Sequence, residues 1–157
     1  MSTAKSPPEG YHSVTPYLIV DGAARAIDFY KEAFGAVESM RLPGPGGKIG
    51  HAEIRIGDSA IMVADEFPDM DIFGPKANGG SAISLVVYVE DCDAVVDRAV
   101  RAGASLKRAP ADQFYGDRSG TVEDPYGHAW HVHTHLRTVS PAELEKAAAE
   151  MAKKAGG

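Results

Sequence analysis

One pattern occurs twice in this chain of 157 residues, and it limits the possible folds more than any other feature. A strand-like segment leads into an acidic residue, a helical run of apolar side chains, a Gly-Ala pair and another strand-like segment. The first copy is Val14–Val20, Asp21, a run through Ala26, Ile27 and Tyr30, and Gly35-Ala36; the second is Ile83–Val89, Asp91, a run through Val95, Val96 and Ala99, and Gly103-Ala104. Because so short a unit buries little surface alone, each helix should cover its own strands and the two units should associate.

The remaining segments complete two βαβββ units and divide the chain. Further strands are expected at Ala36–Leu42, Ile49–Ile56, Ala60–Ala64, Ala104–Lys107, Thr121–Glu123 and Ala129–Thr134. We expect a flexible N-terminus at 1–12, a first module at 13–66, a linker at 67–80, a second module at 81–136 and a helical tail at 137–157. Ser140-Pro141-Ala142-Glu143 is a capping box that opens the tail helix. Asp21 and Asp91 are the expected caps of the two module helices.

Charge and composition exclude several classes of partner. The net charge is −6, and Lys and Arg form no block, so nucleic-acid binding and binding to anionic membranes are not expected. The longest apolar run, Ile83–Val89, is too short to span a bilayer, and Met1–Gly10 shows no apolar signal region. Cys92 is the single cysteine, which rules out an intrachain disulfide and favours the cytoplasm.

Several motifs in a fixed order resemble the vicinal oxygen chelate superfamily, which includes glyoxalase I, extradiol dioxygenases and bleomycin-resistance proteins, and are nearest its PhnB-like branch. They are Thr15–Gly22 leading into Ala26–Gly35, His51-Ala52-Glu53-Ile54 followed by Ile61–Glu66, then Tyr115-Gly116-Asp117-Arg118 and Asp124–Trp130. The resemblance implies an α+β fold whose two modules form a cupped mixed β-sheet, with helices on its convex side and a ligand site in the hollow. It also implies a homodimer.

Alternation along the strands predicts which side chains face that hollow. The expected set is Thr15, Tyr17 and Ile19; His51, Glu53 and Arg55; Ser84, Val86 and Tyr88; and Ala129, His131 and His133. Trp130 falls on the opposite, apolar face. We predict His51, Glu53 and His131 as catalytic or anchoring groups, and Thr15, Tyr17, Arg55, Met62, Ser84 and Tyr88 as ligand-binding groups. A polar pair of His51 and Glu53 with Arg55, and simple packing at the tyrosines, remain alternatives.

The resemblance also indicates which residues would hold a metal ion. Metal-dependent members use four ligands, which align with Thr15, Met62, Ser84 and His131. Only His131 is a good ligand for a divalent ion, so this quartet is broken. A rebuilt site could use His131 and His133, about 6.5–7 Å apart on one strand face, with His51 or Glu53 as a third ligand for zinc, nickel, manganese or iron. The alternative is a hydrogen-bonded His131 with His133 at the solvent end of the strand.

These observations lead to two functional hypotheses. The leading one is a homodimeric protein that binds a small molecule, aromatic or cationic, in a concave cleft without the metal quartet. The alternative is a divalent-metal-dependent lyase, isomerase or dioxygenase with the rebuilt histidine site. Methyl transfer is not expected, because the chain has no glycine-rich strand-to-helix nucleotide motif.

Overall fold

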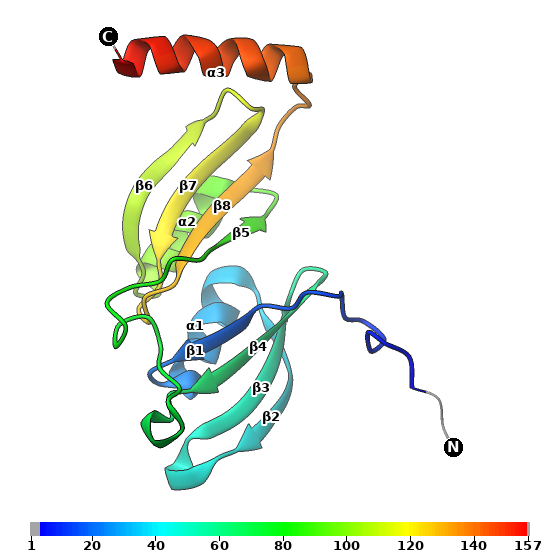
Figure 1. The fold of residues 1–157 in the computed structure, drawn as a ribbon, viewed down its shortest axis with the longest axis vertical. Helices are drawn as coiled ribbons and strands as arrows, with labels where there is room; N and C mark the ends of the chain where they lie inside the picture. Colours follow the sequence, from blue (N-terminus) through cyan, green and yellow to red (C-terminus); the bar gives the residue numbers. More distant parts are fainter. Residues whose placement is uncertain (1–3, 157) are drawn as a thin grey trace.

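The protein folds into two βαβββ modules followed by a helix (Figure 1). The structure, a computed structural model, describes residues 4–156. Its elements are β1 Tyr17–Val20, α1 Ala23–Phe34, β2 Val37–Pro43, β3 Ile49–Ile56, β4 Ser59–Asp65, β5 Ser84–Tyr88, α2 Cys92–Arg101, β6 Ser105–Asp112, β7 Asp117–Glu123, β8 Ala129–His135 and α3 Pro141–Gly156, with short 3-10 turns η1 Pro45–Gly47 and η2 Pro68–Met70. The predicted α+β class and the duplicated unit are confirmed.

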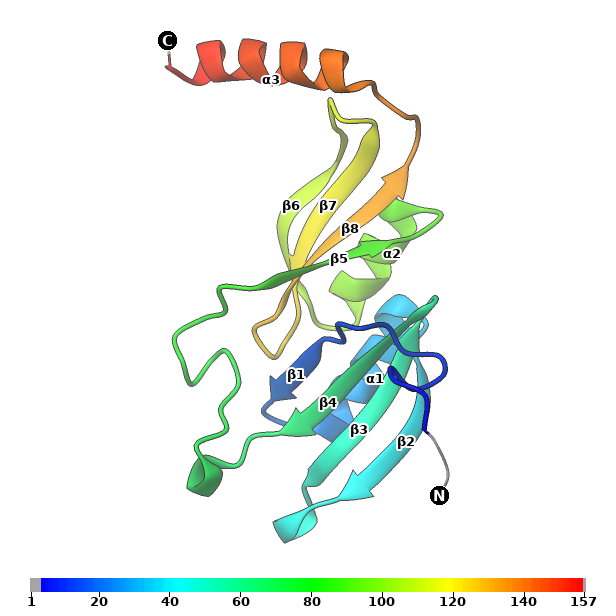
Figure 2. The same ribbon diagram turned by 45° about the vertical axis from the view of Figure 1, so that its right-hand side comes forward.

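The strands form two separate four-stranded sheets rather than one common sheet. Their orders are β1-β4-β3-β2 and β5-β8-β7-β6, and within each the first pair is parallel and the others antiparallel. The mixed sheet expected from the sequence is thus divided into one four-stranded part in each module. β1 and β5 are edge strands, each with one strand neighbour in the part of the chain that the structure describes. The modules instead meet through their helices and the start of β8, while the linker follows a separate path (Figure 2).

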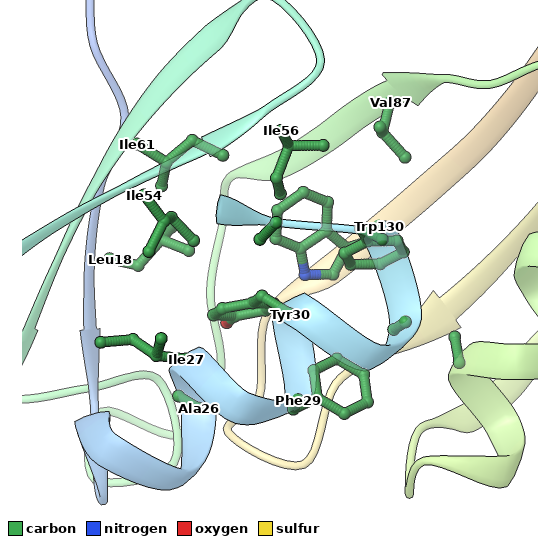
Figure 3. Close-up of a cluster of buried hydrophobic side chains, with 14 of the residues drawn as sticks. Leu18, Ala26, Ile27, Phe29, Tyr30, Ile54, Ile56, Ile61, Val87 and Trp130 are labelled. Atoms are coloured by element: carbon green, nitrogen blue, oxygen red, sulfur yellow. The ribbon is translucent and has the colours of Figure 1, made fainter. Parts of the chain in front are cut away.

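Each sheet is covered on one face by its own helix, as expected. α1 packs on β1, β3 and β4, and α2 packs on β6, β7 and β8. The apolar stripe of α1 includes Ala26, Ile27 and Tyr30, all fully buried, because residues three and four apart lie on one helix face. The core continues between the modules, where the ring of Trp130 lies 5.5 Å from that of Tyr30 and 4.6 Å from that of Phe34 (Figure 3).

A buried carboxylate joins the modules at this point. Asp124 Oδ2 accepts hydrogen bonds from the hydroxyl of Tyr30 at 2.6 Å and from Nε1 of Trp130 at 2.9 Å. Its Oδ1 accepts from the backbone N–H groups of Tyr126 at 2.9 Å and His128 at 3.0 Å, and so caps the turn that precedes β8. Burial, together with the nearby Asp124 carboxylate, raises the pKa of Tyr30, so its hydroxyl stays a donor.

The two module helices are capped differently. Asp91 accepts from the N–H of Ala94 at 3.1 Å and confirms the predicted cap of α2. The predicted Asp21 cap of α1 is wrong, because Gly22 occupies the cap position and Asp65 Oδ1 accepts from the N–H groups of Gly22 at 3.0 Å and Ala23 at 2.8 Å. β4 runs parallel to β1 and places Asp65 opposite the last residue of β1, so a neighbouring strand supplies the cap.

The chain ends in the predicted helix. The N–H of Glu143 donates to Oγ of Ser140 at 3.2 Å, which confirms the capping box. α3 buries none of its described residues and lies beyond the β6–β7 end of the second module (Figures 1 and 2). Within residues 4–156 no helix has the length and apolar character needed to cross a membrane. Residues 1–3 of the expected flexible N-terminus, and residue 157, lie outside the described residues.

Candidate functional site

The sheet faces turned away from the helices carry the candidate site residues. On β1, Leu18 is buried while Tyr17 is 48% exposed, and on β5, Val87 is buried while Tyr88 is 67% exposed. The exposed face of the first sheet is called the first open face and carries Tyr17, His51, Glu53, Arg55 and Met62. The exposed face of the second sheet is called the second open face and carries Ser84, Tyr88, His131 and His133. The strand alternation expected from the sequence therefore holds. Trp130 is 2% exposed and lies in the core, as predicted.

The two faces are separate in a single chain. The sheets share no strand pairing, and none of the hydrogen bonds among residues 4–156 joins a residue of one open face to a residue of the other. Thr15 precedes β1 and lines a cavity of about 390 Å³ between the modules, together with Val86 and Tyr88. Apart from Thr15 and Tyr88, which share this cavity, one chain thus brings the predicted residues together in two groups rather than in one hollow.

On the first open face a histidine links a phenol to a carboxylate. His51 Nδ1 lies 2.8 Å from the hydroxyl of Tyr17, and His51 Nε2 lies 2.8 Å from Oε2 of Glu53. The carboxylate can only accept, so Nε2–H donates to it, and Nδ1 of a neutral ring then accepts from Tyr17. Burial raises the pKa of Tyr17, which keeps its hydroxyl protonated. The predicted pairing of His51 with Glu53 is therefore present, and it includes Tyr17.

The N-terminal segment also reaches this face. The hydroxyl of Tyr11 donates to Oε1 of Glu53. Arg55 Nη2 donates to the carbonyl oxygen of Gly10 at 2.7 Å, and its guanidinium carbon lies 5.5 Å from the centre of the Tyr11 ring. Nothing in the strand and helix periodicity indicated Tyr11, because it lies outside the repeated unit.

A cavity of about 640 Å³ adjoins the first open face beside Tyr17. Its apolar wall comes largely from the linker, through Phe67, Ile72 and Phe73. The linker is fixed by a bridge between Phe67 and Ile72 and by the N–H of Gly74 donating to Glu66 at 2.9 Å. The apolar residues in an otherwise polar linker are the signal that would have found this wall.

On the second open face His131 lies between two hydroxyl groups. Its Nδ1 is 2.9 Å from Oγ1 of Thr121, and its Nε2 is 3.0 Å from Oγ of Ser84. Burial lowers the pKa of His131, and the nearby His133 and Arg108 add to this effect. The ring is therefore neutral near pH 7, with one nitrogen donating and the other accepting.

His133 is held by a carboxylate that is not among the predicted site residues. Asp117, 5% exposed, accepts from Nδ1 of His133 at 2.9 Å and from Nδ1 of His135 at 2.7 Å. Burial alone would raise the pKa of Asp117, but these two hydrogen bonds outweigh it and lower the pKa. The His133 ring stacks on that of Tyr115 at 6.0 Å and meets the edge of Tyr88 at 5.6 Å. The motif Tyr115-Gly116-Asp117-Arg118 was the available signal for this cluster.

The four residues that align with the metal quartet do not suit a divalent ion. Thr15 and Met62 belong to the first module, whereas Ser84 and His131 belong to the second. One imidazole, one thioether and two hydroxyls are a poor donor set for such an ion. The rebuilt pair lacks its third ligand within one chain, because His51 and Glu53 lie on the other sheet. Across the described part of the chain, no three His, Cys, Asp or Glu side chains are placed to hold a metal.

Comparison with known proteins places this geometry in context. A family model described as the glyoxalase/bleomycin resistance protein/dioxygenase superfamily matches residues 10–132. An uncharacterised protein of Mycobacterium tuberculosis strain H37Rv is 43% identical over 138 residues, which are 86% of this chain and 81% of the relative. The anthracycline biosynthesis protein DnrV of Streptomyces peucetius is 32% identical over 126 residues, or 80% of this chain and 42% of the longer relative.

Solved structures share the fold. The Arabidopsis thaliana At5g48480 gene product has a TM-score of 0.63 at 28% identity, with 78% of this chain and 98% of that chain covered. A PhnB protein from Bacillus cereus has a TM-score of 0.59 at 19% identity, with 78% of this chain and 99% of that chain covered, and this likeness concerns the fold alone. The two-module architecture and its order of elements are thus shared with proteins from plants and bacteria.

Proposed function

Because the chain belongs to the glyoxalase/bleomycin resistance protein/dioxygenase superfamily, we propose that it binds a small aromatic molecule on its open sheet faces, without a metal quartet. One observation carries the proposal. Tyr17, which is hydrogen-bonded to His51 and through it to Glu53, lines a 640 Å³ cavity whose wall includes Phe67 and Phe73. A concave apolar pocket with a few fixed polar groups is the usual form of a small-molecule site.

Exposed aromatic side chains favour a planar ligand. Tyr17 and Tyr88 stand on the two open faces, and Phe67 and Phe73 line the cavity beside Tyr17. Aromatic rings stack on planar ligands, and a net charge of −6 attracts cations. A planar, cationic polycyclic compound satisfies both features. DnrV, the relative whose name refers to anthracycline biosynthesis, supports the same class.

In this proposal His51 and Glu53 orient the Tyr17 hydroxyl, which contacts the ligand. Met62 lies beside Tyr17 in the register of β1 and β4 and adds apolar surface. On the second face, His131 and Ser84 form a second hydrogen-bonding point. Thr15, Met62, Ser84 and His131 are a poor donor set for a divalent ion, and this supports the proposal over the metal-dependent alternative.

We further propose that two copies of the chain form a homodimer, in which the first open face of one meets the second open face of the other. The unpaired edges of β1 and β5 support this arrangement, as do exposed apolar side chains on the sheets. These are Val37, Leu42, Val86 and Leu106, each about half exposed or more. Light scattering after size exclusion should give twice the chain mass of 16.6 kDa. A cytoplasmic location belongs to the proposal, supported by a single cysteine that can form no intrachain disulfide.

The binding proposal is tested by calorimetry with an anthracycline and with bleomycin. Tyr17→Ala should weaken anthracycline binding about tenfold or more, which is about 1.4 kcal/mol, because the ring and its hydroxyl are both removed. Val100→Ala, on an exposed part of α2 away from both faces, is the matched control and should change nothing. Dialysis against EDTA should leave the affinity unchanged. Anthracycline affinity that is insensitive to Tyr17→Ala, or lost with EDTA, would refute the proposal.

A further inference from the structure

The N-terminal segment docks on the first open face through a built turn. The N–H of Tyr11 donates to the carbonyl oxygen of Pro8 at 3.0 Å, which reverses the chain before β1. Its side chain is part-buried and ends on Glu53, a predicted site residue. Tyr11 therefore occupies one of the two carboxylate oxygens of the candidate site, while His51 holds the other.

A glycine lets this turn approach Arg55. Gly10 has φ +83°, in the left-handed region that side chains disfavour, and a Cβ built there would lie 2.6 Å from Arg55 Nη2. The same Arg55 nitrogen donates a hydrogen bond to the Gly10 carbonyl oxygen at 2.7 Å. The guanidinium thus lies over the Tyr11 ring and is anchored beside it.

We propose that Tyr11 is a built-in occupant of a phenol-binding subsite formed by Glu53 and Arg55, and that a phenolic ligand binds there by displacing it. The inference rests on the proposed function, because it concerns the same face, and it specifies the ligand class. A carboxylate that accepts from a ring hydroxyl, with a cation over the ring, recognises a phenol. Glu53 stays oriented by His51 when Tyr11 leaves, so the subsite keeps its shape.

Displacement has a cost that can be measured. A ligand binds only the fraction of molecules in which Tyr11 is undocked, so its apparent affinity is reduced by that fraction. When Tyr11 leaves, its hydrogen bond to the Glu53 carboxylate and its cation–π contact with Arg55 are both lost. Removal of the phenol should therefore tighten binding of a phenolic ligand about tenfold, which corresponds to about 1.4 kcal/mol.

The test uses the full chain and the fluorescence of 2-naphthol, with 2-methoxynaphthalene as a matched probe that cannot donate a hydrogen bond. Tyr11→Ala should bind 2-naphthol about tenfold more tightly than the unmodified protein, and at least about tenfold more tightly than it binds the ether. Weaker or unchanged binding of 2-naphthol would show that Tyr11 is part of the wall, and would overturn the proposal. Equal affinity for both probes would remove Glu53 as the recognition group and overturn it as well.

Gly10→Val is the second variant, because it keeps the phenol but prevents the approach to Arg55. It should reproduce the gain for 2-naphthol. If Tyr11→Ala binds 2-naphthol more tightly but Gly10→Val does not, undocking of Tyr11 is not the cause of the gain in affinity. That result would also count against displacement. Both positions precede the first strand, so circular dichroism should show unchanged secondary structure in each variant.

The two proposals fail in different ways. If 2-naphthol and the anthracycline bind in a Tyr17-dependent manner but Tyr11→Ala gives no gain, only the displacement inference is wrong. If neither compound binds any variant, the proposed function itself is wrong.

Discussion

Replacement of Asp124 by alanine should weaken the junction between the two modules and lower the free energy of unfolding. The carboxylate, 2% exposed, accepts from the hydroxyl of Tyr30 and Nε1 of Trp130, and these side chains are 0% and 2% exposed. After Asp124→Ala both donors stay buried without an acceptor. Each unsatisfied side-chain donor costs about 1–3 kcal/mol, so the free energy of unfolding should fall by at least about 2–6 kcal/mol, before the lost turn bonds from Tyr126 and His128 are counted. That is a large part of the 5–15 kcal/mol typical of a folded domain.

The assay is urea unfolding at pH 7, followed by circular dichroism and by fluorescence. Trp130 is the only tryptophan in the sequence, so fluorescence reports on the junction between the modules, whereas circular dichroism reports on the whole chain. Tyr30→Phe is the matched variant, because it removes one donor and leaves no orphan on Tyr30. It should cost about 1.5–3 kcal/mol, the value of a hydrogen bond to a charged group.

Two results would refute this reasoning. One is a loss below about 1 kcal/mol for Asp124→Ala, which would mean that water or another acceptor reaches the buried donors. The other is a larger loss for Tyr30→Phe than for Asp124→Ala, since the hydroxyl would then stabilise the junction through a partner other than Asp124.

Three further predictions concern single sites. The pKa of Asp117 is lowered in the folded state, so its contribution to stability is complete above about pH 4 and is lost as the pH falls through the folded pKa. Asp117→Asn should therefore make the melting temperature less dependent on pH below about pH 4. A pH dependence of the melting temperature that is the same in both proteins would contradict this. Burial raises the pKa of Cys92, which is 2% exposed, so iodoacetamide at pH 8 should modify the folded protein at least about 100-fold more slowly than the urea-unfolded chain; equal rates would argue against burial. Gly116 has φ +99°, and a Cβ there would lie 2.1 Å from the carbonyl oxygen of Arg137. Gly116→Ala should therefore lower the free energy of unfolding, measured by urea titration, by more than about 1 kcal/mol. An unchanged urea midpoint would mean that the 137–139 segment shifts freely.

Much of the fold follows from local patterns. The helix through Tyr30 and the strand Ile49–Ile56 were predicted because apolar residues recur at the helical and strand periods, and these periods reflect backbone geometry. The same alternation placed His51 and Glu53 on one face and Ala52 on the other. Asp91 caps its own helix, and a capping carboxylate three residues before the N–H that donates to it is visible in sequence.

Tertiary partners were not accessible in this way. Asp65 replaces Asp21 as the cap of α1 because β4 runs beside β1, which is a matter of sheet order. Asp117 meets His133 through the register of β7 and β8, and Tyr11 reaches Glu53 from outside the repeated unit. None of these pairs follows a local period.

The sequence by itself therefore determined the repeated unit, the helices, the strands and the side of each strand that faces away from its helix, because all of these depend on backbone periodicity within a few residues. The tertiary structure alone decided that the modules form two sheets, that Asp124 joins them, and that Tyr11 lies against the candidate site. Such contacts depend on how distant segments approach one another, and the physical cause is packing and hydrogen-bond satisfaction across the whole chain.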